Sequence, residues 1–185
     1  MTIGPEGFVG DQQADRRVHG GPDKAVHLYP AAHYARLAKR FLKAAAQFVP
    51  GSIGENISTA ELTEADVRVG DIWQLGSARL QVCQPRNPCW KIDARYGCEG
   101  IARFIASESI AGWYWRVLAP GIVDGGDTLE LVEPARAPTL REALSLLGEH
   151  RPSLDRLQQL IDAPGIAENW RTVLVKRFDW LHRNT

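Results

Sequence analysis

Alternation of apolar and polar residues dominates the middle of the chain. Between residues 62 and 132 this alternation has a period of two, and turn residues separate the runs. Such a pattern is typical of strands with one buried face. We therefore expect a hairpin that turns at Gly76-Ser77 and joins strands at residues 71–75 and 78–82. Further strand-like runs are residues 67–69, 113–118 and 128–132.

A helical pattern precedes the strands. Apolar residues recur at helical spacing from Tyr34 to Phe48, between Pro30 and the pair Pro50-Gly51, and they predict one helix in this interval. The first 28 residues carry closely spaced glycines and prolines, so they have room only for short strands. Residues 98–107 fit either a short helix or a loop.

Three short helical patterns follow Pro134. A capping box of Thr139 and Glu142 precedes the first, at residues 140–147. Ser153 is a candidate cap for the second, at residues 154–161. One face of the third consists of Trp170, Val173, Leu174, Arg177, Trp180 and Leu181. The simplest architecture is a mainly β chain of the α+β class, with a body at residues 1–135 and a three-helix C-terminal domain at residues 136–185.

Composition narrows the class of protein. The 185 residues are 44% hydrophobic and 24% charged, and 22 basic residues balance 22 acidic ones. This composition predicts a soluble, globular protein with no general attraction to nucleic acid. No apolar run approaches the roughly 20 residues of a membrane helix, and the N-terminus lacks a signal core. Three cysteines argue against a secreted disulfide scaffold, so we expect a cytoplasmic protein.

The stretch Gln81–Lys91, QVCQPRNPCWK, carries the most specific chemistry. Cys83 and Cys89 are too far apart for the paired ligands of a zinc site, and a reducing compartment disfavours a disulfide between them. Cys83 ends a strand pattern and is expected to be a small buried residue. Cys89 follows a bend with two prolines, and Arg86 and Lys91 would favour its thiolate, which is a nucleophile and a soft-metal ligand. The residues alone leave a structural and a functional Cys89 equally open.

Several motifs together resemble the MOSC family, which is named after the C-terminal domain of molybdenum cofactor sulfurase. The most specific are HGGPDKA at residues 19–25 and QPRNPCWK at residues 84–91. GSIGENIS at residues 51–58 and VGD at residues 69–71 add to them. The resemblance covers nearly the whole chain, including the helical tail. Within the family, the chain is similar to proteins that confer resistance to 6-hydroxylaminopurine.

This resemblance implies a β-barrel-like body that binds the molybdenum cofactor (molybdopterin), with Cys89 as the molybdenum ligand. It implies a reductase of N-hydroxylated bases, independent of pyridoxal phosphate, that takes electrons from a separate flavin-dependent protein. A membrane or nucleic-acid partner is not expected, and a homodimer is compatible with the resemblance. The chain begins about one strand pair later than such proteins usually do, so we expect either that the barrel lacks an edge or that the start of the sequence is truncated.

The resemblance also gives roles to the HGGPD segment. His19 is expected to face the metal and to donate a proton, since a histidine can do so near neutral pH. Gly20 and Gly21 are expected to let an anion or substrate approach their amides closely. Without the resemblance, the same residues would form an ordinary glycine turn. Asp23 is expected to hold this loop at the cofactor.

Three residues elsewhere complete the expected site. Arg86 is either a surface charge or a fork that binds phosphate beside the metal ligand, and we favour the second role. Asn56 either stabilises a turn or hydrogen-bonds the cofactor or substrate. Lys91 is expected to add positive potential near the cofactor. His27 is interpreted as a packed residue.

Two other functions stay open. In the first, the chain is a carrier of molybdenum cofactor or sulfur, in which Cys89 holds a persulfide or hands on the cofactor without turnover. In the second, it is a non-enzymatic module whose tail docks a partner through Trp170 and Trp180. A measurement of molybdenum content separates the docking module, which would hold none, from the reductase and the carrier. Turnover with an artificial reductant then separates the reductase from the carrier.

Overall fold

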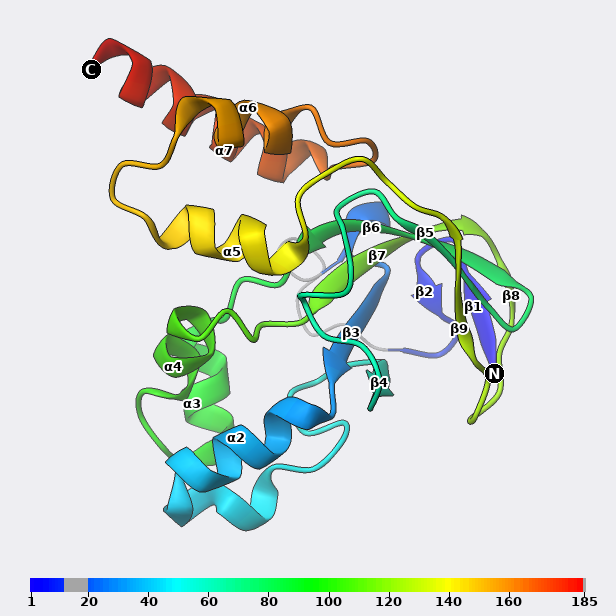
Figure 1. Cartoon of the computed structure of the whole chain (residues 1–185). Helices are drawn as coiled ribbons and strands as arrows, with labels where there is room; N and C mark the ends of the chain where they lie inside the picture. Colours follow the sequence, from blue (N-terminus) through cyan, green and yellow to red (C-terminus); the bar gives the residue numbers. More distant parts are fainter. Residues whose placement is uncertain (12–19, 185) are drawn as a thin grey trace.

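Two sheets form the body of the protein. The computed structural model describes residues 1–11 and 20–184 (Figure 1). One sheet has three strands in the order β2-β1-β8, and the other has six in the order β4-β3-β7-β6-β5-β9. Strands β3 and β4 run parallel, whereas the other neighbours run antiparallel. The strands are β1 (Thr2–Gly4), β2 (Gly7–Phe8), β3 (Val26–Pro30), β4 (Ile57–Thr59), β5 (Ile72–Leu75), β6 (Ala78–Pro85), β7 (Trp113–Ala119), β8 (Gly121–Ile122) and β9 (Leu129–Glu133).

The six-stranded sheet curls into a half-barrel. In the part of the chain that the structure describes, no ladder joins the edge strands β4 and β9, so the sheet is not closed. Three of its tryptophans, Trp73, Trp113 and Trp115, are buried in the main core. The ring centroid of Trp115 lies 6.2 Å from that of Trp73 and 6.3 Å from that of Trp113. The expected α+β class is confirmed. The expected barrel is correct only in part, because its two edges do not meet.

The predicted hairpin is confirmed. Leu75 pairs with Ala78 across the turn at Gly76-Ser77, and β5 and β6 run antiparallel from there. The runs at residues 113–118 and 128–132 correspond to β7 and β9. Residues 67–69 do not form a strand, since Arg68 makes only an isolated bridge to Thr139.

The helix predicted between Pro30 and Pro50 is two shorter elements. Pro30 ends strand β3, and a helix α2 (Ala32–Arg40) is followed by a 3-10 helix η2 (Leu42–Gln47). The break lies at Phe41, whose backbone has left the helical region at φ −120° and ψ 72°. This break allows Phe41 and Phe48 to pack into one aromatic group with Phe104 and Tyr96. Tertiary packing therefore overrides the continuous pattern.

Two short helices follow β6. The ambiguous segment at residues 98–107 contains α4 (Ile101–Ser107), and the preceding α3 (Trp90–Tyr96) was not anticipated. The Asp93 carboxylate joins them, because it accepts hydrogen bonds of 2.8 Å from the backbone N–H groups of Gly100 and Ala102. Helix α3 lacks a clear apolar stripe at its start, where Trp90 is 73% exposed.

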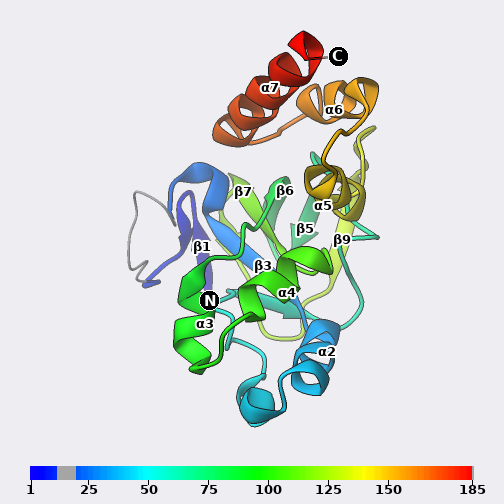
Figure 2. The same ribbon diagram turned by 90° about the vertical axis from the view of Figure 1, so that its left-hand side faces the viewer.

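The three tail helices are confirmed as α5 (Leu140–Gly148), α6 (Leu154–Ile161) and α7 (Glu168–Arg183). They lie together at the opposite end of the molecule from α2 (Figure 2). The capping box of Thr139 and Glu142 is present at α5. Ser153 does occupy the capping position of α6, but its side chain makes no capping hydrogen bond.

The tail and the sheet share one hydrophobic core. Its main cluster contains Val82 and Trp73 of the sheet together with Leu157 and Leu174 of the tail. A second cluster lies among α2, α3 and α4. The division of the chain between residues 135 and 136 stays a prediction.

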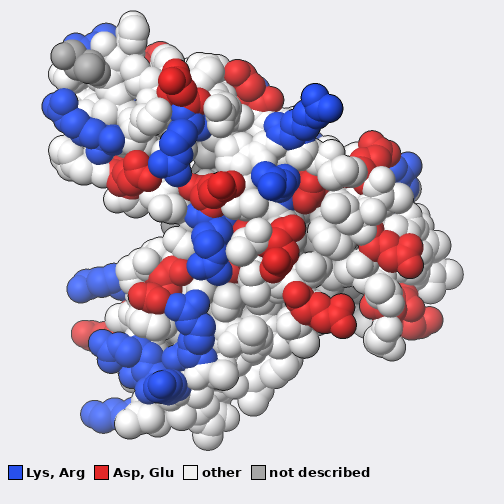
Figure 3. Space-filling view, in the orientation of Figure 1, with Lys and Arg blue, Asp and Glu red and all other residues white. Residues whose placement is uncertain are grey.

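Charges of both signs are interspersed on one face of the molecule (Figure 3). On the face shown in Figure 3, basic and acidic side chains alternate, and basic ones gather at the end of the molecule that carries α2. The last turn of α2 contributes Lys39 and Arg40 there. None of the helices within residues 1–11 and 20–184 is both long and apolar enough to span a bilayer.

Candidate functional site

The bend before Cys89 begins where β6 leaves the sheet. Pro85 is the last residue of β6, and the backbone N–H of Arg86 donates one further hydrogen bond, of 3.0 Å, to the carbonyl of Gly112. Pro85 and Pro88 carry no N–H, so the segment cannot continue a regular ladder. Cys89 then occupies the capping position of α3 with an extended backbone. The bend thus carries Cys89 away from the sheet and ends at a helix.

Gly112, whose carbonyl accepts the hydrogen bond from Arg86, holds the start of this bend. Its φ is +69°, and a Cβ at this position would lie 2.3 Å from the carbonyl oxygen of Leu28, so only glycine fits. The N–H of Gly112 donates to Glu64 Oε1 over 2.7 Å, and Glu64 Oε2 lies 2.7 Å from Nε2 of the buried His33. The pair of His33 and Glu64 is therefore part of the support for Arg86. Sequence reasoning missed it, because the two residues lie in different segments without a shared motif.

Cys83 and Cys89 have different surroundings. Cys83 is fully buried, and its thiol donates a hydrogen bond of 2.8 Å to the carbonyl oxygen of Asp23. Burial raises the pKa of the Cys83 thiol far above its ordinary value. Cys89 is only half-buried, and neither cysteine forms a disulfide. Cys83 is thus the inert structural residue that the strand pattern predicted, and Cys89 is the accessible thiol of the pair.

Arg86 lies close to Cys89 and is held by the 50–56 loop. Its Nη1 donates a hydrogen bond of 3.0 Å to the carbonyl oxygen of Ile53. The pKa of Tyr114 is raised chiefly by burial, and Arg86 and Cys89 both act on it electrostatically. Arg86 and Cys89 are therefore both within electrostatic range of Tyr114.

His27 and Asn56 form a tightly paired support beside Arg86. The His27 N–H donates to Asn56 Oδ1, and the Asn56 N–H donates to the His27 carbonyl, both over 2.8 Å. Asn56 Nδ2 also donates to Asp11 over 2.9 Å. Burial, and next the charge of Arg86, lower the pKa of His27 well below its usual value of 6.5. His27 is 4% exposed, which agrees with a packed, neutral ring.

The loop before β3 is anchored through Asp23. This residue lies in a short 3-10 helix, η1 (Pro22–Lys24), and its carboxylate forms an ion pair with Arg116 at 2.5 Å. The backbone carbonyl of Asp23 also accepts a hydrogen bond from the Cys83 thiol. Both the carboxylate and the carbonyl of Asp23 therefore hold the loop against the sheet. Gly21 has a φ of +93° with open space beside it, and Gly20 is half-buried. His19 lies outside the described residues, and its expected role stays a prediction.

A cavity of about 460 Å³ adjoins the bend, and we call it the bend cavity. Lys24 of η1 and residues 84–88 form its polar side. The opposite side is formed by five residues of the tail: Leu144, Leu147, Asn169, Trp170 and Val173. Cys89 directly follows the last of the bend residues that line it. Lys91 is exposed on α3 and does not line this cavity.

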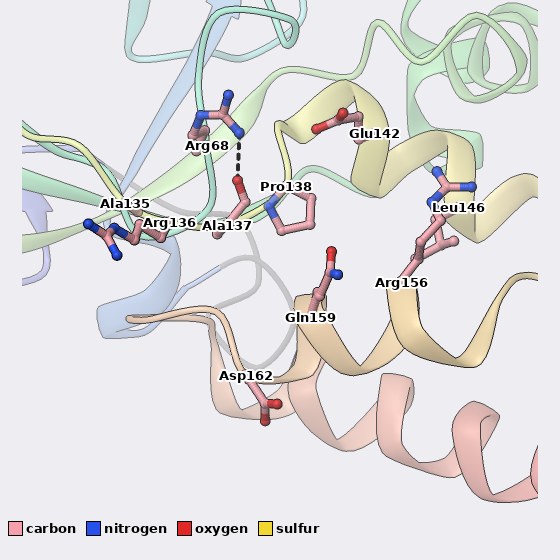
Figure 4. A pocket seen from close by; sticks show the side chains of 10 residues that line it. All are labelled: Arg68, Ala135, Arg136, Ala137, Pro138, Glu142, Leu146, Arg156, Gln159 and Asp162. Carbon is pink, nitrogen blue, oxygen red and sulfur yellow. Dashed lines mark hydrogen bonds between the residues drawn. The ribbon is translucent and has the colours of Figure 1, made fainter.

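A second cavity, of about 690 Å³, lies between α5, α6 and the segment that leads into α5 (Figure 4). Two of its three arginines, Arg68 and Arg156, already have partners. Arg68 donates to the carbonyl of Ala137 over 2.7 Å, and Arg156 pairs with Glu149 at 3.0 Å. Among the residues that the structure describes, neither cavity has a cysteine or histidine in its lining. The bend cavity is lined by Arg86 and by Pro88, the residue directly before Cys89, and we therefore place the candidate site there.

Metal ligation at this site would depend on a single thiol. Within the described parts of the chain, no three side chains of the His, Cys, Asp and Glu types cluster in a way that could hold a metal ion. A cofactor that brings most of its own ligands fits such a site, since a thiolate from the protein then completes the coordination.

Comparisons with known proteins identify relatives over nearly the whole chain. The model of the MOSC domain matches residues 15–130. Protein YiiM of Escherichia coli is 39% identical over 171 residues, covering 92% of this chain and 76% of that protein. The crystal structure of YiiM from Escherichia coli superposes with a TM-score of 0.87 at 34% identity, covering 96% of this chain and 84% of that one. A protein of Gibberella moniliformis named "Reductase" is 34% identical over 69% of this chain and 23% of its own length.

Proposed function

The chain belongs to the MOSC domain family, and from this premise we propose that it binds the molybdenum cofactor and reduces N-hydroxylated bases such as 6-hydroxylaminopurine. Membership associates the chain with the molybdenum cofactor in general. The relative named "Reductase" supports an oxidoreductase role, although the match covers a small part of that protein. The substrate class and the dependence on molybdenum are the proposal.

The contrast between Cys83 and Cys89 carries the proposal. Cys83 is sealed inside the sheet and hydrogen-bonded, whereas Cys89 is half-buried at the end of a rigid bend beside a cavity. A thiolate is a ligand that soft metals prefer. Arg86 and Lys24 add positive charge next to it, which suits the anionic tail of a pterin cofactor. The residues present therefore fit the group.

Each residue of the site has a distinct task in this proposal. Cys89 would hold the metal of the cofactor, and Arg86 would direct its remaining N–H groups at an anionic oxygen, because the bond to Ile53 occupies only Nη1. Lys24 would contribute charge from η1, and Lys91 would contribute it from the surface of α3. His27 and Asn56 would keep the loop beside Arg86 in place.

The overall reaction converts an N–OH group into an N–H group and water, with two electrons and two protons consumed. The cofactor, when bound, supplies the two-electron chemistry that removes the oxygen. We assign the electrons to a separate flavin-dependent donor and one proton to His19. A histidine suits this role because it exchanges a proton near neutral pH.

Metal analysis of cysteine variants tests the assignment. We expect protein from a host that makes the cofactor to contain molybdenum, and Cys89→Ala to lose it. Cys98→Ala is a matched control, because Cys98 is also half-buried and also has a free thiol, but lies beyond the other end of α3. That variant, and Cys83→Ala where it folds, should keep most of the metal. Equal loss from Cys89→Ala and Cys98→Ala would contradict the assignment.

Turnover separates the enzyme from the carrier. With a chemically reduced dye as electron donor, the protein should convert 6-hydroxylaminopurine to adenine, and Cys89→Ala should not. Protein that holds molybdenum but shows no turnover would instead support the carrier function.

A further inference from the structure

The first turn of α7 forms part of the bend cavity. Three residues of α7 line the cavity: Asn169, Trp170 and Val173. Because Val173 follows the other two by four and three positions, all three lie on one side of the helix. The most deeply buried residues of α7 are others, since Leu174 is fully buried and Leu181 is 5% exposed. Trp170 is only half-buried. Its side chain packs against the main core cluster and also lines the cavity.

A backbone contact fixes this wall relative to the bend. The N–H of Ala167, the capping residue of α7, donates a hydrogen bond of 3.0 Å to the carbonyl of Cys83 in β6. The turn before it packs equally closely, because a Cβ on Gly165 would lie 2.4 Å from the side chain of Gln81. Strand β6 runs from these contacts directly into the bend. The positions of Asn169 and Arg86 across the cavity are therefore coupled through one strand.

The two sides of the cavity differ in chemistry. Arg86 and Lys24 supply charge on the side of the bend, whereas the tail supplies an indole, aliphatic side chains and one amide. A planar heteroaromatic base has apolar faces and a polar edge, so it matches this combination. An asparagine amide offers one acceptor and two donors and can pair with the N6 and N7 edge of adenine. The volume of about 460 Å³ lies within the range of small-molecule sites.

We propose that Trp170 and Asn169 form the purine-recognition wall of this site, with the indole stacking on the base and the amide hydrogen-bonding its edge. The proposal rests on the function proposed above and names the residues that select the substrate class. It gives the C-terminal helices a direct role in recognition in addition to their role in the core.

Binding of adenine to cofactor-free protein tests this wall without turnover. Adenine is the product of 6-hydroxylaminopurine reduction, and the full chain from a host that lacks the cofactor can be titrated by calorimetry or ligand-observed NMR. Trp170→Leu keeps an apolar side chain for packing but removes the stacking surface, so we expect binding to weaken roughly 5- to 150-fold. Trp170→Phe should stay within about threefold of the original protein, because a ring is retained.

Two further variants sharpen the test. Asn169→Ala should weaken adenine binding by roughly 5- to 150-fold, the usual effect of losing a bidentate amide–adenine pair. Trp180→Ala is the matched control, since Trp180 lies on the same helix, is 50% exposed and does not line the cavity. It should bind adenine as the unmodified chain does. The wall is overturned if the unmodified chain binds no adenine, if Trp170→Leu binds it equally well, or if Trp180→Ala loses as much.

Failure of this inference differs from failure of the proposed function. If adenine binding depends on Trp170 but the protein holds no molybdenum, the wall stands and the reductase function falls. If the loaded protein reduces 6-hydroxylaminopurine but Trp170→Leu leaves both its KM and adenine binding unchanged, the function stands and the wall falls. With both correct, Trp170→Leu should raise KM for the purine while molybdenum content stays unchanged.

Discussion

Arg86 joins the bend to the 50–56 loop, so the shape of its side chain matters as well as its charge. Its backbone N–H bonds to Gly112 and its Nη1 bonds to Ile53. A lysine would keep the charge but lose the planar fork that allows one nitrogen to hold Ile53 while others face the cavity. Lys91, by contrast, is exposed on α3.

We therefore expect Arg86→Lys to cost nearly as much as Arg86→Ala, on the order of 1.5–3 kcal/mol in cofactor retention or rate. Lys91→Arg should be nearly silent because it conserves the charge. The measurement is molybdenum content and turnover for all three variants at one ionic strength. Full activity in Arg86→Lys would show that charge alone suffices at this position.

His27 should make stability depend on pH. Its pKa in the folded protein is lowered well below 6.5, first by burial and then by the charge of Arg86. The unfolded chain therefore binds a proton near pH 6.5 that the folded chain excludes, and the free energy of unfolding should fall as pH decreases below about 6.5. One such group gives a slope of up to about 1.4 kcal/mol per pH unit.

Urea unfolding between pH 7.5 and pH 5 measures this slope. His27→Asn, which removes the titrating ring, should show a shallower slope than the unmodified protein. His182→Asn is a control on the surface of α7, since His182 is exposed, and it should leave the slope unchanged. An identical slope in His27→Asn and the unmodified protein would remove His27 as its origin.

Single residues were predicted best where the local pattern determined their surroundings. The end of an alternating strand predicted a buried Cys83, and two prolines predicted the bend that presents Cys89. The sequence left Asn56 open between a turn and a ligand contact, and the structure shows its amide bonded to His27 and Asp11. Such partners are distant in sequence, so no local pattern carries them.

At the scale of elements, the N-termini of α5 and α6 differ in whether the capping side chain makes a hydrogen bond. The Thr139 side chain accepts a hydrogen bond from the Glu142 N–H, and Glu142 bonds back to Thr139. Ser153 is the capping residue of α6 without such a bond. We expect Thr139→Ala to lower the free energy of unfolding by about 0.5–2 kcal/mol and Ser153→Ala to lower it clearly less. Thermal unfolding of both variants checks this, and equal losses would contradict it.

Elements were predictable from sequence where their patterns agreed with packing. The hairpin of β5 and β6 followed from alternation and a glycine turn. The single helix expected up to Pro50 was wrong, because the packing of Phe41 and Phe48 breaks it into α2 and η2. Helix α3 has little helical periodicity in its sequence, since its first residues face solvent. Its position is secured by Asp93, which accepts hydrogen bonds from backbone N–H groups at the start of α4.

For the molecule as a whole, the shared core predicts that the body and the tail unfold together. Leu174 of α7 is fully buried in the main cluster, whereas the adjacent Val173 is 57% exposed. Leu174→Ala should lower the free energy of unfolding by about 2–5 kcal/mol, and Val173→Ala by no more than about 0.5 kcal/mol. Circular dichroism of the helices and fluorescence of the sheet tryptophans should shift by the same amount in Leu174→Ala. Two separate transitions would show that residues 136–185 fold independently.

The complete site could not be predicted from sequence because it combines distant parts of the chain. The motif at residues 84–91 indicated the bend and its charges. The opposite wall comes from α5 and α7, and the sequence pattern indicated Trp170 of α7 only as part of a helix face or of a partner surface. The shared core and the contacts of Ala167 with Cys83 and of Gly165 with Gln81 bring the two sides together.

The open half-barrel also bears on how copies of the protein behave toward each other. An unpaired strand edge can add a strand from another chain, which is a route to aggregation. Here β4 has only three residues, and β9 places the exposed Glu130 and Glu133 along its length. Short edges and charged edges are both poor templates for such pairing. Each of the two edges therefore has a feature that disfavours the addition of a strand from another chain.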